Sequence, residues 1–265
     1  MPTTRPDNSS SEVGGGGEVS DPRVLNIAGY LFTELHDLER LRSLLFSAAR
    51  ELGLLGTVLI ASEGINVFLA GRQTEVRDWL DRVRAEPGFS RFTVKESWSA
   101  TVPFQRLKVK VKREIIRMDH PTVSPTHQRA NAVAAVTLKH WLDQGHDDEG
   151  RTIVMLDTRN AFEVECGTFV GAVHWDITKF TEFPERVAAR AAELSGQRVV
   201  SFCTGGIRCE KAALFMREAG VDNVVQLDGG ILQYFGDVGQ THFTGTCFVF
   251  DERVSLKGNL EPTDH

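Results

Sequence analysis

The first half of the chain alternates short apolar runs with two amphipathic stretches. Residues 24–32, 57–60, 67–69, 92–96 and 107–116 have the apolar content of strands, and apolar positions recur at helical spacing over 38–52 and 76–83. Gly53 ends the first helical stretch, and Pro87-Gly88 ends the second. The order β-α-β-β-α-β with one additional strand predicts a ferredoxin-like α+β domain over residues 23–117.

The second half has a different rhythm. Residues 118–131 are rich in Pro, His, Thr and Ser and lack an apolar period, which predicts a linker. Beyond it, expected helices (138–142, 180–194, 209–219) alternate with buried strands (152–156, 198–202, 224–227). This alternation predicts an α/β domain over 132–240, with a mainly parallel sheet flanked by helices, and a C-terminal extension over 241–265.

Composition narrows the possibilities further. The net charge of −6 over 265 residues excludes a global basic field, so any nucleic-acid contact must be a local patch. Residues 1–22 are polar and glycine-rich, which predicts a disordered tail. We find no apolar run of membrane-spanning length and no secretory signal, and therefore expect a cytoplasmic protein without a membrane partner. The dispersed cysteines and histidines predict neither a disulfide framework nor a metal site.

The most informative segment follows the strand at 198–202. Cys203 stands at its end, and Thr204, Gly205, Gly206, Ile207 and Arg208 lead directly into a helix. Glycines and a helix N-terminus supply inward-pointing N–H groups, which stabilise a thiolate or hold an anionic substrate. We therefore expect Cys203 to be catalytic, the five following residues to bind substrate, and Arg208 to face an anion.

The length of this loop favours one chemistry over another. It is one residue shorter than the loop of cysteine-dependent phosphatases, so it suits a sulfur atom better than a phosphate group. Cys209 can act as a resolving thiol or simply pack, whereas Cys166 and Cys247 are expected in the core. Asp157, Arg159 and Glu163 are expected to be structural, with an ion pair between Arg159 and Glu163 at helical spacing.

A basic stripe lies in the first half of the chain. Arg106, Lys108, Lys110 and Lys112 alternate with apolar residues, so they share one face of a strand. Two interpretations remain open: an edge strand protected by lysines from aggregation, or a surface that binds the RNA backbone. Phe104 and Trp98 could stack on a base, although aromatic residues more often pack in a core.

Several segments together resemble a known family. The Cys203–Arg208 loop, with 157–160 and 167–172, resembles rhodanese-type sulfurtransferases. Further segments extend the resemblance, namely 62–66, 108–115, 228–232 and 247–251. With them, nearly everything after residue 22 resembles the bacterial rhodanese-like tRNA uridine hydroxylases. This resemblance implies oxygen-dependent hydroxylation of the wobble uridine of tRNA at C5 through Cys203. It further implies tRNA as partner and molecular oxygen as co-substrate; no other cofactor is evident and no DNA partner is expected.

Two rival functions remain at this point. A plain sulfurtransferase would take sulfur from a small-molecule donor as a Cys203 persulfide and pass it to a thiol or to cyanide. A non-catalytic recognition module would use the same fold to hold a partner, but such modules usually lack the reactive cysteine that this chain keeps.

Overall fold

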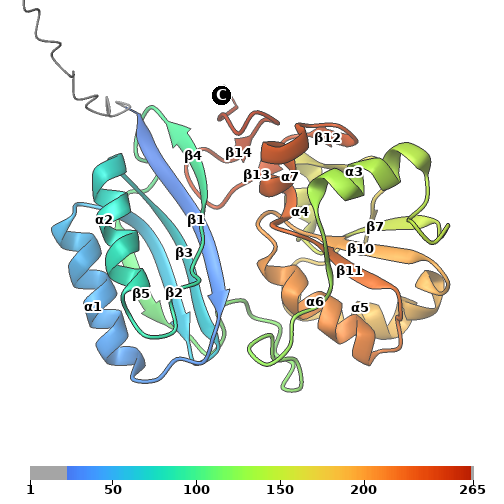
Figure 1. Ribbon diagram of the computed structural model, residues 1–265, viewed down its shortest axis with the longest axis horizontal. Helices are drawn as coiled ribbons and strands as arrows, with labels where there is room; N and C mark the ends of the chain where they lie inside the picture. Colours follow the sequence, from blue (N-terminus) through green and yellow to red (C-terminus); the bar gives the residue numbers. More distant parts are fainter. Residues whose placement is uncertain (1–22, 264–265) are drawn as a thin grey trace, which may run out of the picture.

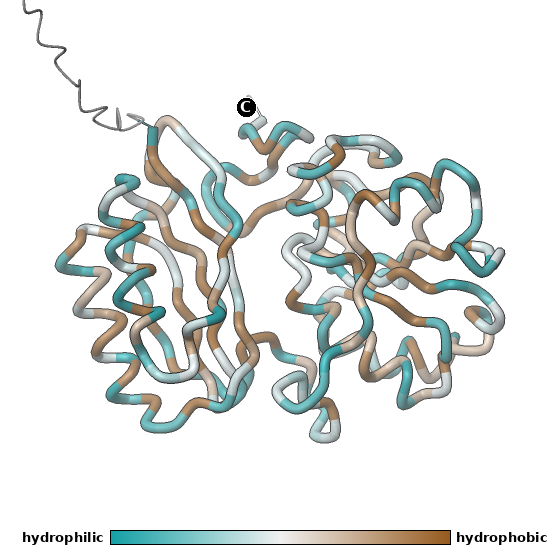
Figure 2. The backbone as a smooth tube through the Cα atoms, viewed as in Figure 1, coloured by the Kyte–Doolittle hydropathy of each residue, from teal (hydrophilic) through white to brown (hydrophobic). Residues whose placement is uncertain are grey.

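The computed structural model describes residues 23–263, so the tail expected at 1–22 lies outside the described residues. Two sheets stand next to each other across a central gap, each with its own helices (Figure 1). Their strands are predominantly hydrophobic, whereas the outer turns of the helices are largely hydrophilic (Figure 2).

The first sheet has five strands in the order β4-β1-β3-β2-β5. Its elements are β1 (Val24–Phe32), α1 (Leu38–Glu51), β2 (Leu55–Ala61), β3 (Gly64–Gly71), α2 (Gln73–Arg84), β4 (Lys95–Ser99) and β5 (Leu107–Val111). β4, β1, β3 and β2 pair antiparallel, and β5 adds to the edge parallel to β2. This is the ferredoxin-like arrangement with one additional strand, as the sequence pattern predicts.

Helices cover only one face of this sheet. α1 and α2 bury their apolar stripes, including Leu45 and Trp79, against Leu25 and Ile27 of β1. Because side chains alternate along a strand, Asn26, Ala28 and Tyr30 of β1 belong to the opposite face. Among the described residues no helix covers that face, which is turned toward the second half of the molecule (Figure 1). We call it the open face.

The second sheet has the order β6-β11-β10-β7-β9, and all of its strands are parallel. The strands are β6 (Ala132–Val133), β7 (Ile153–Asp157), β9 (Val173–His174), β10 (Arg198–Phe202) and β11 (Val224–Leu227). The helices are α3 (Ala135–Gln144), α4 (Ala161–Cys166), η1 (Phe180–Glu182), α5 (Phe183–Arg190), η2 (Ala191–Leu194), α6 (Ile207–Glu218) and α7 (Gly230–Val238). α3 and α7 pack in one apolar cluster, α5 and α6 in another. The expected parallel α/β sheet is therefore confirmed.

The remaining segments connect the two halves. Residues 118–131, expected as a linker, form no helix or strand but bury Met118, Val123 and Ala130 in the cluster that holds α5 and α6. Short strands β8 (Gly167–Phe169) and β12 (Phe243–Gly245) pair, as do β13 (Cys247–Phe248) and β14 (Ser255–Leu256). The C-terminal segment then returns to the first sheet, where Arg253 donates to Ser97 of β4 at 2.7 Å.

Within residues 23–263, we find no helix that combines the length and the apolar character needed to cross a membrane.

Candidate active site

Cys203 lies where β10 ends and its loop turns into α6. Its Sγ accepts a hydrogen bond from the Gly206 N–H at 3.2 Å. Arg208 and Cys209 follow in the first turn of α6 and contribute to the electrostatics of the sulfur. Gly206 has φ +99°, a conformation that side chains rarely adopt, so a glycine is needed where the chain turns its N–H groups toward the sulfur. The structure therefore places one N–H group of the expected cradle, that of Gly206, against the Cys203 sulfur.

The electrostatics of the loop favour a thiolate. Burial by itself raises the pKa of Cys203, but the hydrogen bond from Cys209, the charge of Arg208 and the two N–H groups outweigh it and lower the pKa to about 5. Burial and the adjacent Cys203 sulfur raise the pKa of Cys209, so Cys209 keeps its proton. At neutral pH the pair is thus a Cys203 thiolate that accepts a hydrogen bond from a Cys209 thiol.

Arg208 is held by a carboxylate as well as by the loop. Its guanidinium forms a bidentate ion pair with Glu163 of α4 at 2.6 and 2.7 Å, and both side chains are buried. The expected pair between Arg159 and Glu163 is wrong, because Arg159 binds Asp157 instead at 2.6 Å. Asn160 is the N-cap of α4, so Arg159 precedes the helix and the four-residue spacing brings it to the Glu163 backbone carbonyl, at 3.4 Å, and not to the carboxylate.

A second glycine segment supports the loop from outside. The N–H groups of Ile231 and Leu232, in the first turn of α7, donate to the carbonyls of Cys203 and Thr204 at 3.0 and 3.1 Å. A Cβ on Gly230 would come within 2.4 Å of the Cys203 carbonyl oxygen. Sequence reasoning missed α7, although the Gly229-Gly230 pair was a signal for such a close approach.

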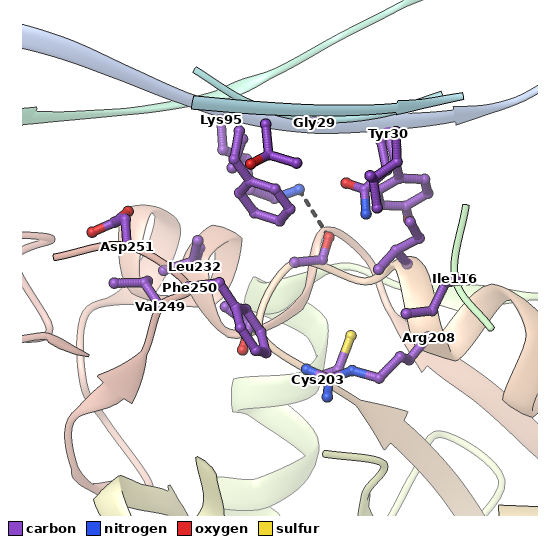
Figure 3. A pocket seen from close by; sticks show the side chains of 18 of the residues that line it. Gly29, Tyr30, Lys95, Ile116, Cys203, Arg208, Leu232, Val249, Phe250 and Asp251 are labelled. Carbon is purple, nitrogen blue, oxygen red and sulfur yellow. Dashed lines mark hydrogen bonds between the residues drawn. The ribbon is translucent and has the colours of Figure 1, made fainter. Parts of the chain in front are cut away.

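The loop borders a cavity of about 1220 Å³ between the two sheets. Cys203, Thr204, Gly205, Ile207 and Arg208 line one side, and the open face of the first sheet lines the other. Val249 and Phe250 of the C-terminal segment flank the loop (Figure 3), and the Arg208 guanidinium lies 6.0 Å from the Phe250 ring centroid. The sulfur itself has 0% exposure, so a substrate must displace a neighbour to reach it.

The basic stripe follows the edge of this cavity. Lys108 and Lys110 belong to β5, with Arg106 before it and Lys112 after it. β5 is an edge strand, and its apolar residues lie on the α1 side, which turns the lysines toward the open face. Lys112 lines the main cavity, and Arg106, Lys108 and Phe104 line a neighbouring hollow of about 400 Å³. Lys108 and Lys110 share one face of β5 as expected, Arg106 and Lys112 lie just outside the strand, and RNA contact stays a prediction.

Two cysteine expectations have different outcomes. Cys247 is buried, as expected, and burial raises its pKa to about 12. The expectation of a core position for Cys166 is wrong: it is half-buried in α4, where its thiol donates to the Phe162 carbonyl at 3.7 Å. α4 has six residues and exposes part of its surface, so its last position does not reach the core.

Sequence reasoning also missed two side chains of the first sheet that contact the loop. The Lys95 ammonium donates to the Gly205 carbonyl at 3.1 Å (Figure 3), and the Tyr30 hydroxyl donates to Glu210 at 3.2 Å. Both belong to the open face, and nothing in their local sequence indicates a partner more than a hundred positions away.

Comparison with known proteins agrees with both halves. Residues 24–115 match the UPF0176 acylphosphatase like domain, and residues 137–237 match the Rhodanese-like domain. A relative from Variovorax paradoxus is 58% identical over 89% of this chain and 90% of its own length. Relatives from Bordetella petrii (56% identical, 91% of this chain, 96% of their own) and Delftia acidovorans (54%, 91% and 91%) are similar. All three are named tRNA uridine(34) hydroxylase, and the chain belongs to this family.

Proposed function

We propose that this protein hydroxylates uridine 34 of tRNA at C5, with Cys203 as the catalytic thiolate and molecular oxygen as co-substrate. The observation that carries the proposal is a cysteine of lowered pKa beside a cavity of about 1220 Å³, in a chain whose relatives bear the name of this activity. The cavity has the size of a small-molecule site, so it can enclose one nucleotide that has left the anticodon stack.

A thiolate has a specific use on uracil. Its sulfur can add to C6 of the ring, so that the S–C6 bond forms while the C5–C6 π electrons move toward O4 as an enolate. This addition makes C5 electron-rich, so that C5 can bind O2 as a hydroperoxide. A two-electron reductant such as an external thiol would then cleave the O–O bond to leave a C5 hydroxyl and water. Loss of the C5 proton restores the C5=C6 bond and expels the Cys203 thiolate from C6. Thr204, Gly205, Ile207 and Arg208 line the cavity and would enclose the base edge nearest the sulfur, while the Gly206 N–H would hold the sulfur itself.

The basic stripe would hold the rest of the tRNA. Lys112 lines the cavity, Arg106 and Lys108 line the neighbouring hollow, and Lys110 lies between them on β5, so the phosphates flanking an inserted nucleotide would pass along this stripe. A protein of net charge −6 repels RNA at long range, so such a local cluster is needed for binding. The sulfurtransferase alternative is not favoured, because the relatives that match most of the chain are named as hydroxylases.

The test uses tRNA from a strain that lacks the gene. Complementation with the wild type or with Cys166→Ser should restore nucleosides derived from 5-hydroxyuridine, measured by mass spectrometry, whereas Cys203→Ser should not. Cys166 is a matched control because its thiol donates within α4, to the Phe162 carbonyl, away from the Cys203 loop. Restoration by Cys203→Ser would refute the role of the thiolate. Unchanged nucleosides with the wild type, together with thiocyanate formation from thiosulfate and cyanide, would favour the sulfurtransferase.

A further inference from the structure

The first three carbonyl groups of the Cys203 loop accept hydrogen bonds from other parts of the molecule. The N-terminal turn of α7 supplies the N–H groups that bind the Cys203 and Thr204 carbonyls. The next carbonyl, that of Gly205, accepts instead from the ammonium group of Lys95, at 3.1 Å. Lys95 comes from β4 of the other half of the molecule, so the first sheet completes a set of contacts that α7 begins.

The peptide group between Gly205 and Gly206 connects Lys95 to the reactive sulfur. In a trans peptide the C=O and N–H bonds point in opposite directions. Here the carbonyl points to the Lys95 ammonium, and the N–H of the same peptide donates to Cys203 Sγ at 3.2 Å. Because Gly205 and Gly206 carry no side chains that restrict it, this peptide would rotate easily without an external contact. Lys95 therefore fixes the orientation of this donor and polarises it.

We propose that Lys95 is a positioning residue that holds the Gly205–Gly206 peptide with its N–H directed at the Cys203 sulfur. The proposal deepens the proposed function and rests on it for its catalytic meaning, because it makes the acylphosphatase-like half part of the cysteine site. A charge-assisted hydrogen bond at one end of a peptide strengthens the hydrogen bond at the other end.

The surroundings of Lys95 are arranged to keep it in place. Its Cε would lie 3.1 Å from a Cβ on Gly229, so the lysine stem passes close over that glycine. Burial lowers the pKa of Lys95 below its ordinary value, and the nearby charge of Arg129 lowers it further, while the Cys203 thiolate and Asp228 offset part of this decrease. The Lys95 ammonium thus lies near two acidic groups, the Asp228 carboxylate and the Cys203 sulfur.

Other charged groups face Cys203 as well, and the test must separate them from Lys95. Arg208, paired with Glu163, and the Cys209 thiol approach from α6. Tyr30 approaches from β1, with its hydroxyl bonded to Glu210, which also binds Arg129 at 3.0 Å. Of these groups in residues 23–263, none is bonded to the Gly205 carbonyl, so substitution of Lys95 removes a contact that the others do not replace.

The test is the pH dependence of Cys203 alkylation by iodoacetamide, followed by mass spectrometry of the peptide that contains Cys203. Lys95→Met removes the donor and should raise the pKa of Cys203 by about one unit, which slows alkylation at pH 5 about fivefold. Lys95→Gln keeps a neutral donor and should give a smaller rise. Lys95→Arg keeps a charged donor and should stay closest to the wild type. The control is Lys139→Met, which removes a cation paired with Asp143 within α3 and should not shift the midpoint.

The outcomes distinguish this proposal from the proposed function. A midpoint in Lys95→Met and Lys95→Gln equal to that of the wild type would overturn the role of Lys95. If Lys95→Met fails to fold by circular dichroism, the comparison of the Gln and Arg variants still decides. A raised midpoint with rescue of tRNA hydroxylation at higher pH supports both proposals. If the midpoint is raised in Lys95→Met but the wild-type protein never modifies tRNA, the positioning role of Lys95 is supported and the hydroxylase function is refuted.

Discussion

The two sheets of this protein use their surfaces differently. The parallel second sheet has helices on both faces and presents Cys203 at the carboxyl end of β10, where ligands usually bind in α/β folds. The first sheet has helices on one face only, and its open face, with Tyr30 and Lys95, becomes a wall of the cavity. One sheet contributes a strand end, the other a whole face, and the candidate site needs both.

This difference separates stability from function within the first sheet. Its covered face buries large apolar side chains such as Trp79 and Leu45. Its open face carries Asn26, Lys95 and the neighbouring stripe of basic residues, which a domain on its own would expose to water. Substitutions on the covered face should therefore lower stability more than substitutions on the open face. In the second sheet, the consequence of a substitution should depend on which end of the strands it lies at.

The largest expected effect is on the covered face. Trp79→Ala removes a fully buried ring and should lower the free energy of unfolding by about 3–5 kcal/mol. Phe68→Ala, on the open face of β3, removes a half-buried ring and should cost about 1 kcal/mol. Urea unfolding followed by circular dichroism measures both. Equal losses would contradict the division between the two faces.

The next effect concerns the joint between the sheets. Lys211 of α6 is 2% exposed and binds Glu63 at 2.8 Å and Glu114 at 2.7 Å, both from the first half of the chain. Lys211→Met leaves two partly buried carboxylates without a cation and should destabilise the protein by about 3 kcal/mol. Arg82→Met, which breaks an exposed pair with Glu51, is the control and should change little. Thermal unfolding measures both variants. Equal melting temperatures for Lys211→Met and Arg82→Met would show that Lys211 does not join the two halves.

Acid should act at the amino ends of the parallel strands, opposite Cys203. Burial raises the pKa of Asp147, but the N–H groups of Arg151 and Glu149 and the Arg198 guanidinium outweigh it and lower the pKa to about 2. Its contribution of about 2 kcal/mol should be complete above pH 4 and be lost as the pH falls toward 2. Unfolding free energies of the wild type and Asp147→Asn should therefore converge below pH 3. A constant difference between them down to pH 2 would contradict this assignment.

The smallest expected effect is on the basic stripe. Replacing Lys108, Lys110 and Lys112 together by Ala should weaken tRNA binding about tenfold at low salt and lower the salt dependence of log Kd by about 2. The unfolding free energy should barely change, because Lys110 and Lys112 are exposed and Lys108 is half-buried. Filter binding across a salt series measures the effect. Unchanged binding would indicate that the lysines protect the β5 edge from aggregation and do not contact tRNA.

Much of the fold was predictable because its signals are local. The strands at 24–32, 198–202 and 224–227 have the predicted bounds, and the glycine turn after Cys203 indicated its N–H cradle. α6 begins at Ile207, two residues earlier than expected, which brings Arg208 and Cys209 into its first turn.

The rest of the site depends on contacts between distant segments. A strand pattern tells which face Lys95 belongs to, but not that Gly205, 110 positions later, lies opposite it. The partner of Glu163 was predicted wrongly for the same reason: the spacing rule considers only its own helix, whereas its partner Arg208 comes from α6. α7 was missed because its start is built from two glycines with positive φ, which sequence patterns normally assign to a turn.

The most direct test is titration of the Cys203 thiol in the wild-type protein, by peptide-resolved alkylation between pH 4 and 10. A sulfur surrounded by the N–H groups of Gly206 and Arg208, the Cys209 thiol and the Arg208 charge should titrate with a midpoint near pH 5. Alkylation with a midpoint at about 8.5, as in an unperturbed thiol, would contradict the account.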